Sequence, residues 1–175
     1  MLGPLRLGLR LAVEKVLRWC LHPRLRACCL RMLGAKIGTN VRIYEIMLIN
    51  PLFGFGHLII GDHSTVGPGT IIDLTGKIEI GQCTSISPGC VLMTHSDPGF
   101  QVGNKLCSIF PRSVSKIKIG DHVWIGANST ILPGVEIDDR TAIGAGSLVT
   151  RNIPSDVLAY GQPARVVRRL FEDDK

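Results

Sequence analysis

The chain has 175 residues, a length typical of one domain with a core of its own. Aromatic residues make up only 5% of it, so aliphatic side chains have to form that core. No apolar run of about 18 residues occurs, which argues against a membrane-spanning helix. Basic residues near the start interrupt any secretory signal, so we expect a protein of the cytoplasm.

The first 36 residues predict a basic amphipathic helical leader. They hold eight basic residues and one acid, a net charge of +7, although the whole chain carries only +6. Polar side chains recur every four residues from Arg6 to Arg18, and leucines and valines fill the other sides, which is typical of a helix. Pro23 interrupts this helix, expected over residues 2–20, and a second one is expected over residues 24–33.

Two interpretations of this leader stay open, and they can coexist. The helices can cap the open end of the following domain, or residues 1–33 can lie on an anionic membrane surface at the inner face of the membrane. Nucleic acid is disfavoured as a partner because no aromatic residues are interleaved with the basic ones.

A branched aliphatic residue recurs at every sixth position in the second half of the chain. The series is Ile119, Ile125, Ile131, Ile137, Ile143 and Val149. A helix face recurs every three or four residues and a strand face every two, so a period of six indicates a repeat. We predict an all-β solenoid of short strands, with three hexads to a coil and the aliphatic residues stacked inside.

The same register extends back towards the leader. The inward positions there are expected to be Ile37, Ile43, Ile49, Ile60, Val66, Ile72, Ile80, Ile86 and Leu92. A loop over residues 50–57 and a two-residue shift at Thr75-Gly76 interrupt the series.

The hexads divide the chain into three parts. The solenoid is expected over residues 37–153. The gap before Ile119 is longer than one coil, so residues 96–116 are expected to be extruded as a loop, and loops on rigid scaffolds often carry function. Residues 154–175 are expected to form a tail with a short helix over residues 163–171.

His95 is the first candidate for chemistry, because it stands where the register breaks into the extruded loop. A histidine suits general-base catalysis near neutral pH. His63 and His122 each follow Gly-Asp at a solenoid corner, and we expect both to be structural. The histidines share no metal-ligand spacing, so no metal site is predicted. The six cysteines form no C-x-x-C pair and are expected to be reduced thiols.

Three segments closely resemble the hexapeptide-repeat acyltransferases. They are IGDHVWIGANSTILPGV from Ile119, IGAGSLVTRNIP from Ile143 and GQPARVVR from Gly161. The resemblance covers residues 34–171 and is strongest to the maltose and galactoside acetyltransferases and the O-acetyltransferases of polysaccharide synthesis. It implies a left-handed parallel β-helix with short terminal helices, a homotrimer, and acetyl-CoA as acyl donor without a metal.

The resemblance also implies roles for residues at the reaction centre. His95 matches the catalytic histidine, and Trp124 matches a tryptophan that lines the acceptor pocket. Asp73 falls where relatives often have an asparagine that contacts the acceptor. Asp97 replaces a second histidine of many relatives and is expected to accept a hydrogen bond from the sugar.

Further matches concern coenzyme A. The backbone N–H of Ala127 is expected at the thioester and the backbone of Ala145 at the pantetheine arm. The remaining matches lie near the nucleotide and phosphates, where guanidinium groups bind well, and they are Thr150, Arg151, Arg165 and Arg168.

The resemblance therefore implies an O-acetyltransferase that acts on a sugar hydroxyl of a capsule, exopolysaccharide or lipopolysaccharide precursor. His95 would take the hydroxyl proton during direct transfer, and Ala127 would stabilise the oxyanion. Close alternatives are N-acetylation of an amino sugar and O-acetylation of serine. A carbonic-anhydrase-like protein lacks its histidine set here, and an inert scaffold would not need His95 and Trp124.

Overall fold

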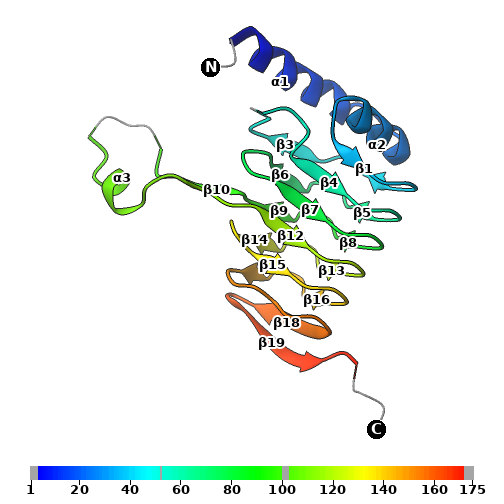
Figure 1. The fold of residues 1–175 in the computed structure, drawn as a ribbon, viewed down its shortest axis with the longest axis vertical. Coiled ribbons are helices and arrows are strands. Elements are labelled where there is room, and N and C mark those ends of the chain that lie inside the picture. Colours follow the sequence, from blue (N-terminus) through cyan, green and yellow to red (C-terminus); the bar gives the residue numbers. More distant parts are fainter. Residues whose placement is uncertain (1–3, 52, 100–102, 172–175) are drawn as a thin grey trace.

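The computed structural model describes residues 4–51, 53–99 and 103–171. Most of the chain winds into a parallel β-helix, and two helices lie across its first coil (Figure 1). The predicted all-β solenoid is therefore confirmed. Each coil passes in turn through three sheets, which form the faces of a prism.

The three faces are here called sheets A, B and C. Sheet A contains β1 (Lys36–Ile37), β4 (Leu58–Ile60), β7 (Ile78–Ile80), β12 (Ile117–Ile119) and β15 (Glu136–Ile137). Sheet B contains β2 (Arg42–Ile43), β5 (Thr65–Val66), β8 (Ser85–Ile86), β13 (Trp124–Ile125), β16 (Ala142–Ile143), β18 (Val157–Gly161) and β19 (Ala164–Arg169). Sheet C contains β3 (Met47–Ile49), β6 (Ile71–Asp73), β9 (Val91–Leu92), β14 (Thr130–Ile131) and β17 (Leu148–Val149).

The aliphatic residues of the hexads stack inside the prism as expected. Ile125, for example, pairs with Ile86 on one side and Ile143 on the other, and all three are buried. One expected inward position is wrong. Leu48 rather than Ile49 is the buried residue of β3 and lies in register with Ile72, because the hexad before β3 is one residue shorter than the rest.

The coils approach each other closely at their corners. A Cβ atom on Gly126 would overlap the backbone nitrogen of Ala145 on the next coil. Glycine is therefore required at this corner for a steric reason. Its neighbour Ala127 is held in place because the carbonyl of Ala127 accepts the N–H of Gly146 at 2.8 Å.

The helix expected over residues 163–171 is wrong. This segment forms β19, which pairs antiparallel with β18 as a hairpin at the end of sheet B. The exposed, β-branched Val166 and Val167 favour a strand, and pairing with β18 satisfies backbone groups that a short surface helix would leave to water.

Two helices cover the first coil of the prism. α1 (Pro4–Arg18) and α2 (Pro23–Met32) agree with the two expected helices to within a few residues, and residues 1–3 lie outside the described ranges. α1 contacts β3, and α2 contacts β1 and β2. No helix within the described ranges combines the length and the apolar content that crossing a bilayer would need.

A long arm leaves the prism between sheets C and A. Its base is an antiparallel pair, β10 (His95–Ser96) with β11 (Ser113–Val114), and its outer part contains α3 (Leu106–Ile109). Figure 1 shows the arm projecting sideways from the coils. The arm corresponds to the loop expected over residues 96–116.

Candidate active site

His95 lies at the base of the arm, where the chain leaves sheet C. Its Nδ1 atom is 2.6 Å from Oδ2 of Asp73, which ends strand β6 on the coil before. The Asp73 side chain is fully buried, whereas 20% of the His95 side chain is exposed. The imidazole therefore stands at the surface on top of a buried carboxylate.

Asp73 is surrounded by hydrogen-bond donors. Its Oδ1 accepts bonds from Asn50 Nδ2 at 3.1 Å and from the N–H and hydroxyl of Thr75 at 3.1 and 2.7 Å. Its Oδ2 accepts the N–H and hydroxyl of Thr94 at 2.9 and 2.7 Å, in addition to His95. Burial by itself raises the pKa of Asp73, but the hydrogen bonds from His95, Thr94, Thr75 and Asn50 outweigh it and hold that pKa well below its usual value.

The ionised carboxylate fixes the tautomer of His95. A carboxylate can only accept hydrogen bonds, so Nδ1 of His95 carries the proton that points at Asp73. In the neutral ring the lone pair is then on Nε2, for which the described residues provide no partner. This arrangement presents a proton acceptor towards solvent.

The place of Asp73 differs from the sequence-based expectation. We expected Asp73 to contact the acceptor, but its two oxygens are buried and taken up by protein donors, so it lies beneath His95 instead. The sequence reasoning did not identify Asn50, Thr75 or Thr94. Thr94 directly precedes His95, and that adjacency was the only available signal for it.

Asp97 lies two residues further along the arm. Its Oδ1 accepts the N–H of Gly99 at 3.0 Å, and its Oδ2 is 3.8 Å from Nε of Arg112, the residue that directly precedes β11. Asp97 thus braces the base of the arm near His95.

Trp124 lies on a different face of the molecule from His95. Its ring projects outward from β13 in sheet B, is 58% exposed and donates from Nε1 to Ser87 Oγ at 3.1 Å. It borders an open cavity of about 350 Å³ whose other lining residues are His122, Arg140, Thr141, Ala142, Leu170 and Phe171. This apolar wall could receive the flat face of a ligand.

Ala127 and Ala145 lie one above the other at the corner between sheets B and C. The two preceding coils have Pro68 and Pro88 at this position of the corner, and proline has no N–H. Within the described residues, the N–H groups of Ala127 and Ala145 have no acceptor. This corner therefore offers two neighbouring donors to a ligand.

The cationic candidates lie towards the end of the prism. Arg165 and Arg168 are both on β19, and both are exposed. Thr150 and Arg151 follow β17 at the edge of sheet C, and within the described residues no hydrogen bond or ion pair joins them to the β19 pair. The four residues therefore lie on two separate segments, β19 and the turn after β17.

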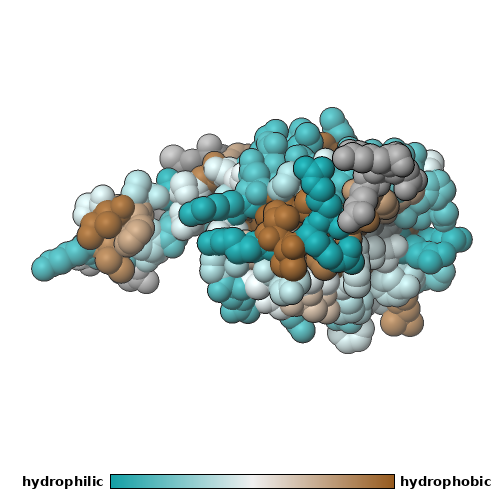
Figure 2. Space-filling view, turned by 90° about the horizontal axis from the view of Figure 1, so that it is seen from below, coloured by the Kyte–Doolittle hydropathy of each residue, from teal (hydrophilic) through white to brown (hydrophobic). Residues whose placement is uncertain are grey.

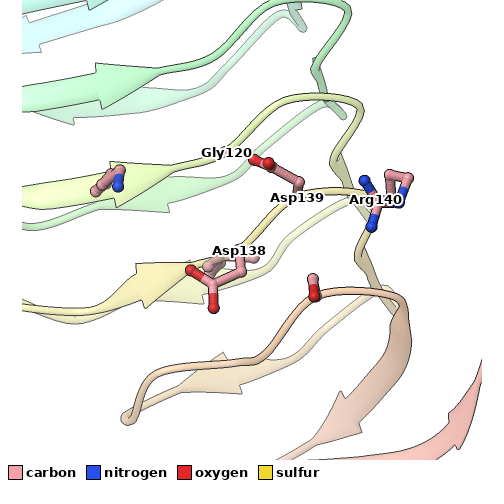
Figure 3. A pocket seen from close by; sticks show the side chains of 7 residues that line it. Gly120, Asp138, Asp139 and Arg140 are labelled. Carbon is pink, nitrogen blue, oxygen red and sulfur yellow. The ribbon is translucent and has the colours of Figure 1, made fainter.

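Another hollow of the surface, with a volume of about 240 Å³, lies at the corner between sheets A and B (Figure 3). Asp139 points from it towards the turn at Gly120 and accepts the N–H of Asp121 at 2.8 Å. Arg140 forms a two-pronged ion pair with Asp156. These side chains hold neighbouring coils together and resemble no catalytic arrangement.

No group of three or more histidine, cysteine, aspartate or glutamate side chains gathers as metal ligands within the described ranges.

Comparison with known proteins assigns the repeats to a family. Residues 116–151 match the family described as bacterial transferase hexapeptide (six repeats). The chain is 34% identical over 151 residues to WcaF of Escherichia coli (strain K12), named as an acetyltransferase of colanic acid biosynthesis, and the match covers 86% of this chain and 78% of that protein. It is also 41% identical over 106 residues to the galactoside O-acetyltransferase of Escherichia coli (strain K12), over 61% of this chain and half of that protein.

Solved structures share the whole architecture. The hexapeptide-repeat acetyltransferase VCA0836 of Vibrio cholerae superposes with a TM-score of 0.78 at 25% identity, over 95% of this chain and 94% of that chain. A galactoside acetyltransferase in complex with coenzyme A superposes with a TM-score of 0.76 at 29% identity, over 96% of this chain and 84% of that chain. The chain is an enzyme and belongs to the hexapeptide-repeat acetyltransferases.

Proposed function

We propose that this enzyme transfers acetyl from acetyl-CoA to a hydroxyl group of a sugar, with His95 as general base. The observation that carries the proposal is the pair of His95 and Asp73, in which a buried carboxylate holds Nδ1–H and Nε2 of the partly exposed ring has no partner among the described residues. A sugar hydroxyl is too weak an acid to attack a thioester unaided, so a base at this point is what the reaction needs.

The proposed transfer is direct and conserves every proton. Nε2 of His95 takes the proton from the acceptor hydroxyl while that oxygen forms a bond to the acetyl carbonyl carbon. The bond from this carbon to sulfur then breaks, and coenzyme A leaves with the proton from His95. Asp73 stabilises the imidazolium that exists between these steps and keeps the ring in its productive orientation.

Two features support acetyl-CoA as the acyl donor. The unpaired N–H groups of Ala127 and Ala145 suit the carbonyl groups of a thioester and a pantetheine arm, and the N–H of Ala127 would stabilise the oxyanion by a few kcal/mol. VCA0836 of Vibrio cholerae was also solved in complex with acetyl coenzyme A and superposes with a TM-score of 0.77. Arg151, Arg165 and Arg168 are the proposed phosphate contacts.

The acceptor is proposed to be a sugar of a polysaccharide precursor. This rests on the names of the relatives, which refer to colanic acid and to galactosides. Trp124, with its exposed ring and adjoining cavity, is the proposed stacking surface for the sugar, and Asp97 the proposed hydrogen-bond acceptor.

We further infer that the complete site lies between two copies in a homotrimer. His95 leaves the prism after sheet C, whereas Trp124 projects from sheet B and Ala127 lies at the corner between these sheets. The arm also exposes apolar side chains, and Figure 2 shows a hydrophobic cluster on its projecting end. The exposed apolar residues of the arm are Leu106, Ile109 and Phe110 in and next to α3, and Val114 on β11 at the base.

Calorimetric titration with acetyl-CoA tests the donor. We expect saturable binding of one molecule per chain. Release of the coenzyme A thiol should then depend on a sugar acceptor from a panel that also contains glucosamine and serine. Absence of acetyl-CoA binding would refute the proposal, and release only with glucosamine or serine would reassign the acceptor.

Mixing two inactive variants tests the shared site. If Trp124 of one copy serves His95 of another, trimers assembled from His95→Ala and Trp124→Ala chains contain some intact sites and regain part of the activity. Mixtures that stay as inactive as the separate variants, despite verified mixed assembly, would contradict a site built from two copies.

A further inference from the structure

The charged residues Glu14 and Arg10 of α1 face the β-helix, beside the buried Leu17. Glu14 is buried, and its Oε1 accepts the N–H of Leu48 at 3.3 Å and Nε of Arg18 at 2.7 Å. Arg10 donates from Nη1 to the carbonyl of Pro51. The charged row predicted from the sequence therefore satisfies backbone groups of the first coil, and the side chain of Arg6 lies outside the described ones.

A buried arginine on α2 completes this inward polar layer. Arg26 donates to the carbonyls of Leu17 and Ile43 at 3.0 and 2.8 Å, and also to that of Cys20. Arg26 thus links the C-terminal end of α1 to strand β2. The helix dipole favours a cation at that end of α1. Both helices are fixed to the prism, so their outer faces have a defined orientation.

With Glu14 and Arg26 turned inward, many apolar side chains are left on the outside. Trp19 is 84% exposed and Leu21 is 97% exposed, and both lie in the connection between the helices. The other exposed apolar side chains of this end are Leu9, Leu11, Val16, Leu25, Met32 and Leu33. Soluble monomers rarely expose so many large apolar residues together, and such a patch marks a binding surface.

The charge of this end identifies the kind of partner. Lys15 and Arg24 are exposed among the apolar residues, whereas Arg31 donates to the carbonyls of Ile37 and Gly38 in the first coil. Glu14, the single acid of residues 1–36, is buried. The outer surface therefore presents cations without anions. A tryptophan, leucines and unbalanced cations on one helical face are the composition of a helix that lies in the interface of an anionic bilayer.

We propose that the outer face of α1, α2 and their connection docks on an anionic lipid bilayer. Trp19 and Leu21 enter the headgroup region, and Lys15 and Arg24 contact lipid phosphates. The helices lie on the membrane and do not cross it, which agrees with the absence of a spanning helix in the described ranges. The β-helix then extends away from the membrane, as its coils stack on the other side of the helices (Figure 1).

Flotation with vesicles tests this proposal on the whole chain of 175 residues. We expect the protein to float with phosphatidylcholine vesicles that contain about 30% phosphatidylglycerol and not with pure phosphatidylcholine, because anionic lipid supplies the electrostatic part of the binding. High salt should weaken the binding by screening that attraction. Absence of binding to the anionic vesicles would refute the proposal.

Two pairs of substitutions separate the apolar from the charged contribution. Trp19→Ser with Leu21→Ser should lower the partition coefficient about tenfold or more, and Lys15→Glu with Arg24→Glu should do the same while removing the salt dependence. All four side chains are exposed, so the variants should fold, which circular dichroism checks.

Matched controls place equal changes elsewhere. Val166→Ser with Val167→Ser alters two exposed apolar residues at the opposite end of the prism, and Lys105→Glu with Lys118→Glu changes the charge equally on the arm and on β12. Both controls should bind vesicles as the parent does. If the control variants bind vesicles as weakly as the leader variants do, the binding is nonspecific and the proposal is wrong.

A second readout distinguishes a membrane from a protein partner. In a Trp124→Phe background, Trp19 fluorescence should shift to shorter wavelength on anionic vesicles and be quenched by brominated lipid. If Trp19→Ser with Leu21→Ser instead reduces the size of the particle in solution and no quenching occurs, the face packs against another copy, and the proposal is wrong. Acetyl-CoA titration of the same variants separates this outcome from failure of the proposed function.

Discussion

The corner between sheets A and B and the base of the arm use the same residue types in opposite ways. At the corner, Asp62 and Asp121 each accept one backbone N–H from the coil before, at 2.6 and 2.9 Å, and exposed His63 and His122 follow them. At the base of the arm, Asp73 is buried under His95 and accepts bonds from four residues.

The corner is a repeated solution to a local problem. His63 and His122 have φ values of 59° and 57°, in the left-handed region, because the chain has to turn there. Each aspartate then satisfies an N–H group that the turn leaves without a partner. The arm base lies where the repeat is broken, and among the residues that the structure describes only this site places a histidine on a buried carboxylate.

The largest expected effect is that of removing His95, and removal of His63 at the corner is the comparison. We expect His95→Ala to lower kcat by about 10²- to 10⁴-fold, because the base is lost, while acetyl-CoA binding measured by calorimetry persists. His63→Ala is the matched control and should keep its kcat. Equal losses of kcat in both variants, or full activity of His95→Ala, would contradict the role of His95 as general base.

The second comparison exchanges the aspartates. Asp73→Asn puts an amide beneath His95, which no longer favours the productive tautomer or the imidazolium, so kcat should fall about 100-fold with little change in KM for acetyl-CoA. Asp62→Asn, at the corner, should leave kcat unchanged. Steady-state kinetics of both variants decide this, and a KM effect alone would point to a structural role for Asp73.

The third comparison adds a Cβ atom at the corner beside Ala127. Gly126→Ala should lower the free energy of unfolding by about 1–3 kcal/mol, since its Cβ overlaps backbone of the next coil, and should weaken acetyl-CoA binding. Gly8→Ala in α1 meets no neighbouring atom and should stabilise the protein by up to about 1 kcal/mol. Denaturant unfolding measures both, and equal stabilities would disprove the overlap.

The smallest expected effect is a pH dependence of stability. Because the pKa of Asp73 is lower in the folded chain, the unfolded chain binds more protons in acid. The stabilisation is complete above the ordinary pKa of an aspartate and is lost as the pH falls towards the folded value, by about 1 kcal/mol near pH 3. The difference between the parent and Asp73→Asn in unfolding free energy should shrink by this amount on acidification, and a constant difference would contradict it.

The sequence determined the β-helix, because each hexad places one aliphatic residue inside and the period repeats without reference to distant parts of the chain. It also located the arm and His95, since both are visible as a break in that period. The strand β19 escaped prediction because a short segment with valines and arginines fits a surface helix as well as an edge strand, and only the free edge of β18 decided between them.

Only the tertiary structure decided the contacts between coils and the contacts between the helices and the first coil. Asp73 and His95 are far apart in sequence, and their pairing depends on the stacking of β6 on β9. The amphipathic pattern of α1 likewise gives two opposite faces but not their orientation. The unpaired backbone groups of the first coil drew Glu14 and Arg10 inward, because a buried N–H or carbonyl without a partner costs more than exposed leucines do.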